Sequence, residues 1–544
     1  MKSLASAAQI EARPGSISER RQWLTRRRMF WIVAAVALVV YAQSRFWNLP
    51  SAGDRANWDY IAQVISRGGV PYRDVVNIKS PLSAYVGAAA IVTTRPFGLR
   101  DAQAIRITYI LLAALTVAFT FLVALDYFGS RSVAMLASAI MLSFSAVARL
   151  NGGGTQPKTP MILFGLMTLW AIMKDRPFTA GAFGMLSALS WQPGLLFVGA
   201  AGLAFSRYLT SWRDRKVVRL IAGASIPLAI PLIYFWAVGA LKDFYLWNIH
   251  FNATIYGPRG VRTLAGFYHR IGKMLSGTYH GGRYFFYLAA PGLLVALFEE
   301  ARRAKQEGAR SLLDRAPYHA VFIAPLVYFL FCMVDIQGGA DLIPLLPFVA
   351  IFAAIAVAWV VKGAVRLIAR RRPALDGGRL EEWASAAVAA LILVIVTGDA
   401  IFSARDQRLK LQDEEVAQMV SNLEPGDKIY VHGQTEILVL SGLTNASKYY
   451  LLDRGKDEYL DRILDGGFTG WLQTLKEERP KIVALNRIKT LLHKQEFVDW
   501  VRQDYVSRKG RFFEYYIRKD AASGPQAMPG DDEPEEDTQP SDEY

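Results

Sequence analysis

The stretch ITYILLAALTVAFTFLVAL, residues 107–125, contains no charged side chain. A helix needs about 20 mainly apolar residues to cross a bilayer, so this stretch has the length and composition of a transmembrane helix. Similar runs recur along the 544-residue chain, among them WIVAAVALVVYA at 31–42 and LIPLLPFVAIFAAIAVAWVV at 342–361. Hydrophobic residues make up 52% of the sequence. These blocks predict an α-helical polytopic membrane protein and exclude a soluble globular fold.

The apolar blocks predict about eleven transmembrane helices. They lie near residues 29–47, 101–125, 131–149, 159–173, 177–190, 193–207, 217–240, 284–300, 317–334, 342–362 and 384–403. The fifth and sixth segments are short for a bilayer, so they are either tilted or form a re-entrant pair around Gln192-Pro193. A basic N-terminus precedes the first segment, but no small-residue cleavage site follows it. This favours an uncleaved first helix over a signal peptide.

The distribution of charge predicts the orientation of the chain. The net charge is +15, and Lys and Arg cluster beside the apolar segments. Such clusters mark the cytoplasmic side of a membrane, so they require no nucleic-acid partner. They place residues 1–28 in the cytoplasm and, after an odd number of spans, the C-terminal region outside. The transmembrane domain then covers 29–403, with long outer loops at 48–100 and 241–283, and an outer domain covers 404–520.

The outer region 404–520 has the pattern of a small α/β domain. Its predicted elements are strands at KIYVHG (428–433) and KIVALN (481–486), a helix at EFVDWVRQDY (496–505) and a last strand at RFFEYYIRK (511–519). It contains no Gly-rich phosphate loop and no metal-spaced Cys/His set. The acidic tail 521–544 is expected to be disordered. The single cysteine, Cys332, excludes an internal disulfide and is expected to be a packing residue.

The first outer loop is dense in charge: GDRANWDYIAQVISRGGVPYRDVVNIKSPLSAY, residues 53–85. Asp54 follows the first span directly. Apolar residues at 61, 64 and 65 predict a short helix on the membrane surface, ended by Gly68-Gly69. A carboxylate at this depth costs free energy unless it is hydrated or paired, and such acids tend to be functional. Pairing with Arg55 or Arg73, or capping of the helix, would explain Asp54 equally well.

The order of features in this loop resembles a known family. An aspartate follows the first span, and then come a helix, a G-x-P-Y-x-D motif and a K-x-P-L motif. This layout is similar to the first outer loop of GT-C type glycosyltransferases, in particular the bacterial branch related to protein O-mannosyltransferases and aminoarabinose transferases. The matching residues are Asp54, Gly69, Pro71, Tyr72, Asp74, Lys79, Pro81 and Leu82. The stretches GAFGMLSALSWQP, GGADLIPLLPFVAIFAA and PGDKIYVHGQTEILVLSGL also resemble the family, so the likeness touches most of 30–520.

The resemblance implies transfer of a sugar from a polyprenyl-phosphate donor to an acceptor hydroxyl, with inversion, on the outer face of a prokaryotic cytoplasmic membrane. The family's essential aspartate corresponds to Asp54, which implies a general base. Such chemistry is physically reasonable, because a lipid phosphate is already stable as an anion and leaves without a strong general acid. A single carboxylate takes the proton of the hydroxyl, and cations stabilise the charge that develops on the phosphate.

Several cations in the expected outer loops are candidates to hold the donor phosphate. They are Lys79 and Arg73 in the first loop, Lys158 in the short loop 151–158, and Arg259, Arg270, Lys273 and Arg283 in loop 241–283. Asp59, Tyr72, Asp74 and His280 are expected to support the site. Contact with anionic lipid headgroups is the alternative interpretation for each cation.

The chain departs from the family at the second outer loop. Many relatives carry a second acid where NGGGTQPK (151–158) stands here, with Gln156 and Lys158 in its place. His250, His269 and His280 share a loop, but their spacing fits no metal signature. We therefore expect no required metal or other cofactor. The expected partners are the lipid-linked donor, membrane lipids and an acceptor that is a glycan, a lipid or a protein.

Two other functions remain open from the sequence. A lipid-linked glycan ligase or polymerase would rely on the Arg and His residues of 241–283 in place of Asp54. A transporter would need ionisable residues within several spans, and the apolar segments of this chain contain few of them.

Overall fold

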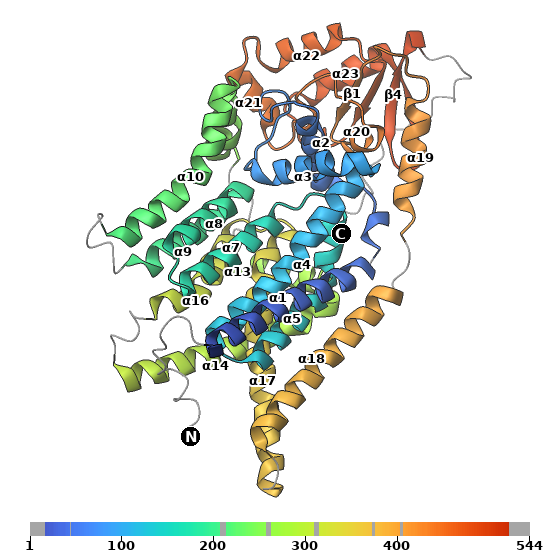
Figure 1. The fold of residues 1–544 in the computed structure, drawn as a ribbon. Coiled ribbons are helices and arrows are strands. Elements are labelled where there is room, and N and C mark those ends of the chain that lie inside the picture. Colours follow the sequence, from blue (N-terminus) through green and yellow to red (C-terminus); the bar gives the residue numbers. More distant parts are fainter. Residues whose placement is uncertain are drawn as a thin grey trace.

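The structure, a computed structural model, describes residues 17–43, 45–206, 214–256, 263–308, 315–372, 376–402 and 406–521. Long helices form one bundle, and a smaller α/β portion lies at one end of it (Figure 1). Arg259 and nearly all of the acidic tail 521–544 lie outside the described residues.

A helix, or a pair of short helices, lies at every position where the sequence predicts a span. These are α1 (Ile17–Gln43), α4 (Asp101–Phe128), α5 (Arg131–Ser143) with α6 (Ser145–Gly152), α7 (Lys158–Met173), α8 (Pro177–Ser190), η3 (Gln192–Gly194) with α9 (Leu195–Ala204), α10 (Arg215–Ala237), α14 (Arg283–Glu307), α16 (Ala316–Val334), η7 (Gly339–Leu345) with α17 (Leu346–Arg371), and α18 (Gly377–Phe402).

Six of the described helices are long and apolar enough to cross a membrane, or seven if α5 and α6, which meet at 55°, form one span. Helix α7 and the η3–α9 segment are apolar but shorter. The protein is therefore a polytopic membrane protein, while the larger number of spans remains a prediction. The short segments at 177–190 and 193–207 correspond to α8 and α9, which pack against each other and are joined through Pro193.

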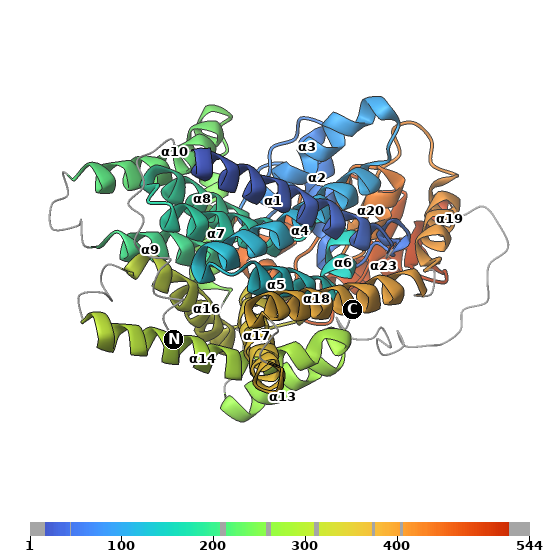
Figure 2. The ribbon, with the colours of Figure 1, turned by 60° about the horizontal axis from the view of Figure 1, so that its bottom comes forward.

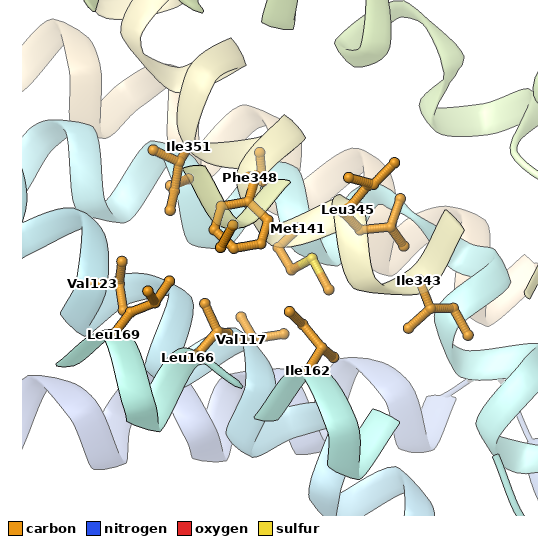
Figure 3. Close-up of a cluster of buried hydrophobic side chains, with 14 of the residues drawn as sticks. Val117, Val123, Met141, Ile162, Leu166, Leu169, Ile343, Leu345, Phe348 and Ile351 are labelled. Carbon is orange, nitrogen blue, oxygen red and sulfur yellow. The ribbon is translucent and has the colours of Figure 1, made fainter. Parts of the chain in front are cut away.

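Packing divides the helices into inner and outer ones. Side chains of α4, α5, α7 and α17 interlock in the centre, where Val117, Leu166 and Phe348 are almost fully buried (Figure 3). Helix α18 lies outside these helices, against α5 and α17 (Figure 2). Only 6% of the most apolar stretch of α18 is buried. Its exposed surface carries Leu391, Val394 and Ile395. An exposed apolar surface along a whole helix is unfavourable in water and suits contact with lipid.

The segment 48–100, predicted to be the first outer loop, contains two helices, α2 (Gly53–Ser66) and α3 (Leu82–Thr94). Helix α2 ends before Gly68, as the sequence predicts. It does not lie on an open membrane surface, however, because Ile61 is buried against the α/β portion and Ala62 against α3 and α4. The apolar stripe that indicated a membrane-surface helix is instead a packing face.

The α/β portion contains a four-stranded sheet of order β1-β2-β4-β3. Its strands are β1 (Ile429–His432), β2 (Ile482–Leu485), β3 (Tyr505–Lys509) and β4 (Glu514–Arg518), and its helices are α19 (Arg408–Val420), α20 (Glu436–Ser441), α21 (Lys456–Ile463), α22 (Gly467–Glu477) and α23 (Lys494–Asp504). Strands β1 and β2 are parallel, with Ile429 opposite Ile482. The three predicted strands and the helix at 496–505 are confirmed, except that Tyr505 begins β3.

Candidate active site

A cavity of about 880 Å³ lies where the helix bundle meets the α/β portion. Its walls come from three parts of the chain. The segment 48–100 contributes Asp54 and Lys79, the adjacent ends of the bundle helices contribute Lys158 and Trp191, and the α/β portion contributes Arg454 and Arg487. Three predicted site residues, Asp54, Lys79 and Lys158, therefore share one cavity.

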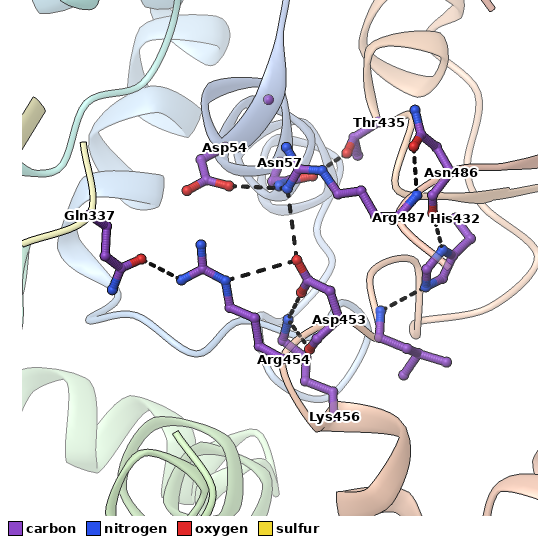
Figure 4. A network of polar contacts seen from close by, with 12 residues as sticks. Asp54, Asn57, Gln337, His432, Thr435, Asp453, Arg454, Lys456, Asn486 and Arg487 are labelled. Carbon is purple, nitrogen blue, oxygen red and sulfur yellow. Dashed lines mark hydrogen bonds and ion pairs between the residues drawn. The ribbon is translucent and has the colours of Figure 1, made fainter. Parts of the chain in front are cut away.

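Asp54 is held at the start of α2. Gly53 adopts a positive φ of 58°, and its N–H donates to Glu436 Oε1 at 2.8 Å, which fixes the first turn against α20. Negative charge is favoured at a helix N-terminus by the helix dipole. The Asp54 side chain is 55% exposed because it faces the cavity, and Arg487 Nη1 lies 3.4 Å from its Oδ1 (Figure 4). The carboxylate is thus both anchored and accessible.

The charges around Asp54 decide its protonation state. Removal from bulk water raises the pKa of this carboxyl, while Arg487, Arg454 and Lys79 lower it and Asp453 opposes them. The cations prevail, and the pKa lies below its ordinary value. Asp54 is therefore ionised at neutral pH, the form that accepts a proton.

Lys79 and Arg454 both contact Tyr256. Lys79 Nζ is 4.8 Å from the centre of the tyrosine ring, and Arg454 Nη1 donates to Tyr256 Oη at 2.5 Å and to Gln337 Oε1 at 2.7 Å. Burial raises the pKa of Tyr256, but the two cations lower it below its ordinary value. Within the described ranges, no carboxylate forms an ion pair with Lys79. This corner of the cavity is suited to an anion.

Lys158 already has a partner. Its Nζ lies 2.7 Å from Asp341 Oδ1 and 4.8 Å from the centre of the Trp191 ring. Asp341 also accepts hydrogen bonds from the backbone N–H groups of Gln337 and Gly338. The charge of Lys158 is therefore balanced in the wall of the cavity.

The other predicted phosphate ligands that the structure describes do not line the cavity. Arg73 pairs with Asp74 at 2.8 Å and donates to Val238 O. Arg270 donates to Ile336 O, and Lys273 lines a separate open pocket together with His269. Arg270 and Lys273 lie on α13 (Leu264–Ser276). The apolar face of this helix packs on the bundle, and most of its polar face points outward. Arg283 lies beside the exposed ring of Tyr284, away from the cavity.

The predicted supporting residues stabilise the loop. Buried Tyr72 donates to Lys79 O at 2.7 Å and so holds the backbone at Lys79, while Asp74 accepts from Val70 N–H and closes the turn 70–74. His280 lies in η6 (His280–Gly282) and not in the cavity wall.

Asp59 is fully buried and accepts from Thr155 N–H at 2.7 Å. Burial raises the pKa of Asp59 to about 6. Gly154 has a φ of +134°, and a Cβ there would lie 2.4 Å from Asp59 Oδ2. Gly154 of NGGGT thus makes room for this carboxylate.

Sequence reasoning missed the residues that the α/β portion contributes. Arg487 directly follows Asn486 at the carboxyl end of a strand parallel to its neighbour, where polar residues of two strands meet at one edge. That signal was available. Asp453 and Arg454 lie in a loop, and Lys456 begins the helix that follows, in a stretch whose sequence has no comparable feature.

The part of the chain that the structure describes holds no group of three His, Cys, Asp or Glu side chains placed to bind a metal ion. No protein-family model and no curated protein matches the sequence.

Solved structures do match the fold. The apo structure of ArnT, the aminoarabinose transferase, from Cupriavidus metallidurans superposes with a TM-score of 0.59 at 14% identity, covering 93% of this chain and 100% of that one. The chain has the fold of GT-C membrane glycosyltransferases. ArnT bound to undecaprenyl phosphate matches with a TM-score of 0.56 at 14% identity, over 91% of this chain and 99% of that one. An oligosaccharyltransferase from Archaeoglobus fulgidus matches with a TM-score of 0.49 at 12% identity, over 90% of this chain and 74% of that one. The predicted resemblance is confirmed at the level of the fold.

Proposed function

We propose that this protein is an integral membrane glycosyltransferase that moves a sugar from a polyprenyl-phosphate donor to an acceptor hydroxyl, with inversion. The observation that carries the proposal is the position of the accessible Asp54 carboxylate in one cavity with Lys79, Arg454 and Tyr256. ArnT, which shares the fold, has been solved with undecaprenyl phosphate bound.

The proposed reaction assigns a role to each group. The acceptor oxygen attacks the anomeric carbon of the sugar and forms the new C–O bond, while the bond from that carbon to the phosphate oxygen breaks. Asp54 takes the proton of the hydroxyl. The electron pair of the broken bond leaves with the lipid phosphate, whose growing charge is stabilised by Lys79 and Arg454. The sugar is a hexose or a pentose, and the reaction needs no metal.

The proposed orientation places the cavity on the outer face of a prokaryotic cytoplasmic membrane. Segment η7 contributes to the cavity wall, and α17 runs away from it to Arg370 and Arg371 in its last turn (Figure 1). Cationic residues favour the cytoplasmic side. This supports an outer α/β domain and, with the proposed odd number of about eleven spans, a cytoplasmic N-terminus. A ligase or polymerase that depends on loop 241–283 gains no support, because Arg270, Lys273 and Arg283 lie outside the cavity.

The test is transfer of a labelled sugar by the purified protein from a panel of polyprenyl-phosphate monosaccharides, with polyprenyl-diphosphate oligosaccharides as the comparison. We expect turnover of at least one monophosphate donor and none of the diphosphates. Turnover of the diphosphates alone would overturn the proposal and favour a ligase.

A further inference from the structure

Two loops of the α/β portion reach the cavity, one directly after β2 and one between α20 and α21. Strand β1 ends at His432 and β2 ends at Leu485, and Asn486 and Arg487 follow β2 directly. Arg487 Nη1 lies 3.4 Å from Asp54 Oδ1 and 3.8 Å from Asp453 Oδ2 (Figure 4). One guanidinium therefore bridges a carboxylate of the first outer loop and a carboxylate of the α/β portion.

The buried ring of His432 joins these two loops. Its Nδ1 lies 2.7 Å from Asn486 O, and Leu452 N–H donates to its Nε2 at 2.9 Å. A carbonyl oxygen only accepts and an N–H only donates, so these partners fix a neutral ring with its proton on Nδ1. Burial lowers the pKa of His432 to about 4, which keeps the ring neutral at physiological pH.

The second loop carries the other cation of the site. Asp453 Oδ1 pairs with the buried Lys456 Nζ at 2.6 Å, which anchors the loop to the start of α21. Arg454, next along the chain, reaches Tyr256 and Gln337. Through His432, the loop that carries Arg454 and the loop that carries Arg487 have a fixed separation.

We infer that Arg487 is a positioning residue for the Asp54 carboxylate, and that His432 positions the Arg487 and Arg454 loops, which makes the α/β portion a working part of the active site. The inference rests on the proposed function. The hydrogen bond from Arg487 Nη1 goes to Oδ1, and in the part of the chain that the structure describes Asp54 Oδ2 accepts no hydrogen bond. This arrangement holds one oxygen of the carboxylate and leaves the other facing the cavity for the acceptor hydroxyl.

The inference predicts a specific pH effect. Arg487 and Arg454 of the two loops, Lys79 of the first outer loop and Arg55 of α2 are the cations around Asp54, and Asp453 and Glu436 are the anions. Asp54 acts deprotonated, so the acid limb of kcat/KM follows its pKa. Without Arg487 the pKa of Asp54 rises, because desolvation is then opposed by fewer cations. The acid limb must move to higher pH.

The experiment measures kcat/KM against pH for Arg487→Gln, Arg487→Lys and a control, Arg479→Gln. Arg479 belongs to the same domain, also has positive φ, and pairs with Asp520 on the surface. We expect Arg487→Gln to lose about tenfold or more in kcat/KM, as a misplaced catalytic group does, with the acid limb shifted upward. Arg487→Lys should shift it less, and Arg479→Gln should match wild type. An Arg487→Gln profile that coincides with wild type would overturn the inference.

Variants of His432 provide the second test. Gln retains one donor and one acceptor, whereas Leu removes both, so His432→Leu should reproduce the shifted profile and His432→Gln should lie between it and wild type. A uniform loss at every pH would show that His432 only stabilises the fold, and would contradict its positioning role. If Asp54→Asn is inactive while Arg487→Gln keeps the wild-type profile, this inference fails and the proposed function stands. If Asp54→Asn is fully active, the proposed function itself fails.

Discussion

Replacement of Lys158 by Gln tests whether this cation stabilises the fold or binds the donor phosphate. Lys158 and Asp341 form an ion pair at 2.7 Å in which the two side chains are 13% and 9% exposed. Lys79 lies in the same cavity, is only partly buried, and forms no ion pair with a described carboxylate. The sequence treats the two lysines alike, whereas their surroundings in the structure differ.

The expected losses of stability and of donor binding follow from these surroundings. Breaking a buried ion pair costs about 3–5 kcal/mol, because one charge is left uncompensated. Asp341 keeps two backbone N–H donors in Lys158→Gln, so we expect the lower end, about 3 kcal/mol of stability. The double variant Lys158→Gln/Asp341→Asn leaves no unpaired charge and should recover most of that loss. A charge-assisted hydrogen bond to phosphate contributes about 1.5–3 kcal/mol, so Lys79→Gln should bind the donor about 10- to 100-fold more weakly without loss of stability.

The assay combines thermal unfolding in detergent with donor binding to the same preparations. We expect a lower melting temperature for Lys158→Gln, recovery in the double variant, and an unchanged melting temperature with weak donor binding for Lys79→Gln. If Lys158→Gln is as stable as wild type and weakens donor binding as much as Lys79→Gln does, the reasoning is refuted and Lys158 is a phosphate ligand.

The remaining predictions concern the α/β portion. Burial raises the pKa of Asp453, but Lys456 and then Arg454 and Arg487 lower it to about 2. This depressed pKa stabilises the fold by about 2 kcal/mol above pH ~4, and the gain is lost as the pH falls from about 4 to 2. Wild type and Asp453→Asn should therefore differ in melting temperature at neutral pH and converge near pH 2; a constant difference would contradict this. Gly433 has a φ of +77°, and a Cβ there would lie 2.5 Å from Asn486 O. Gly433→Ala should cost about 1–3 kcal/mol and shift the acid limb of kcat/KM. Its control, Gly442→Ala, has a similar φ of +71° but its nearest neighbour is 3.7 Å away, so a shift in both variants would refute the role of the close contact.

The sequence predicted the helices well because a membrane span carries its own signal. Charge-free blocks such as 107–125 need no information about their neighbours, and each predicted position holds a helix. Strand β3 was missed because YVSRK is an edge strand with alternate side chains exposed. Its pairing with β4 depends on the turn at Gly510 more than on its composition.

The predicted residues that line the cavity, Asp54, Lys79 and Lys158, all come from the N-terminal part of the chain. Asp54 and Lys79 share one loop, and the turn closed by Tyr72 brings Lys79 back toward α2. Arg454 and Arg487 reach the same cavity from the opposite end of the chain. Arg487 follows a predicted strand, but no local pattern shows that this strand end faces Asp54. The cations of α13 do not line this cavity, because an amphipathic sequence does not reveal which way the polar face of its helix turns.

The most direct test of the account compares Asp54→Asn with wild type in donor binding and in transfer under saturating donor. Loss of a general base costs about 10²- to 10⁴-fold in rate, and Asn removes the base while it keeps the shape of the side chain. The account predicts a fall in kcat of that size with unweakened donor binding and an unchanged melting temperature. Transfer by Asp54→Asn at close to the wild-type rate would contradict the central claim that this carboxylate carries the reaction.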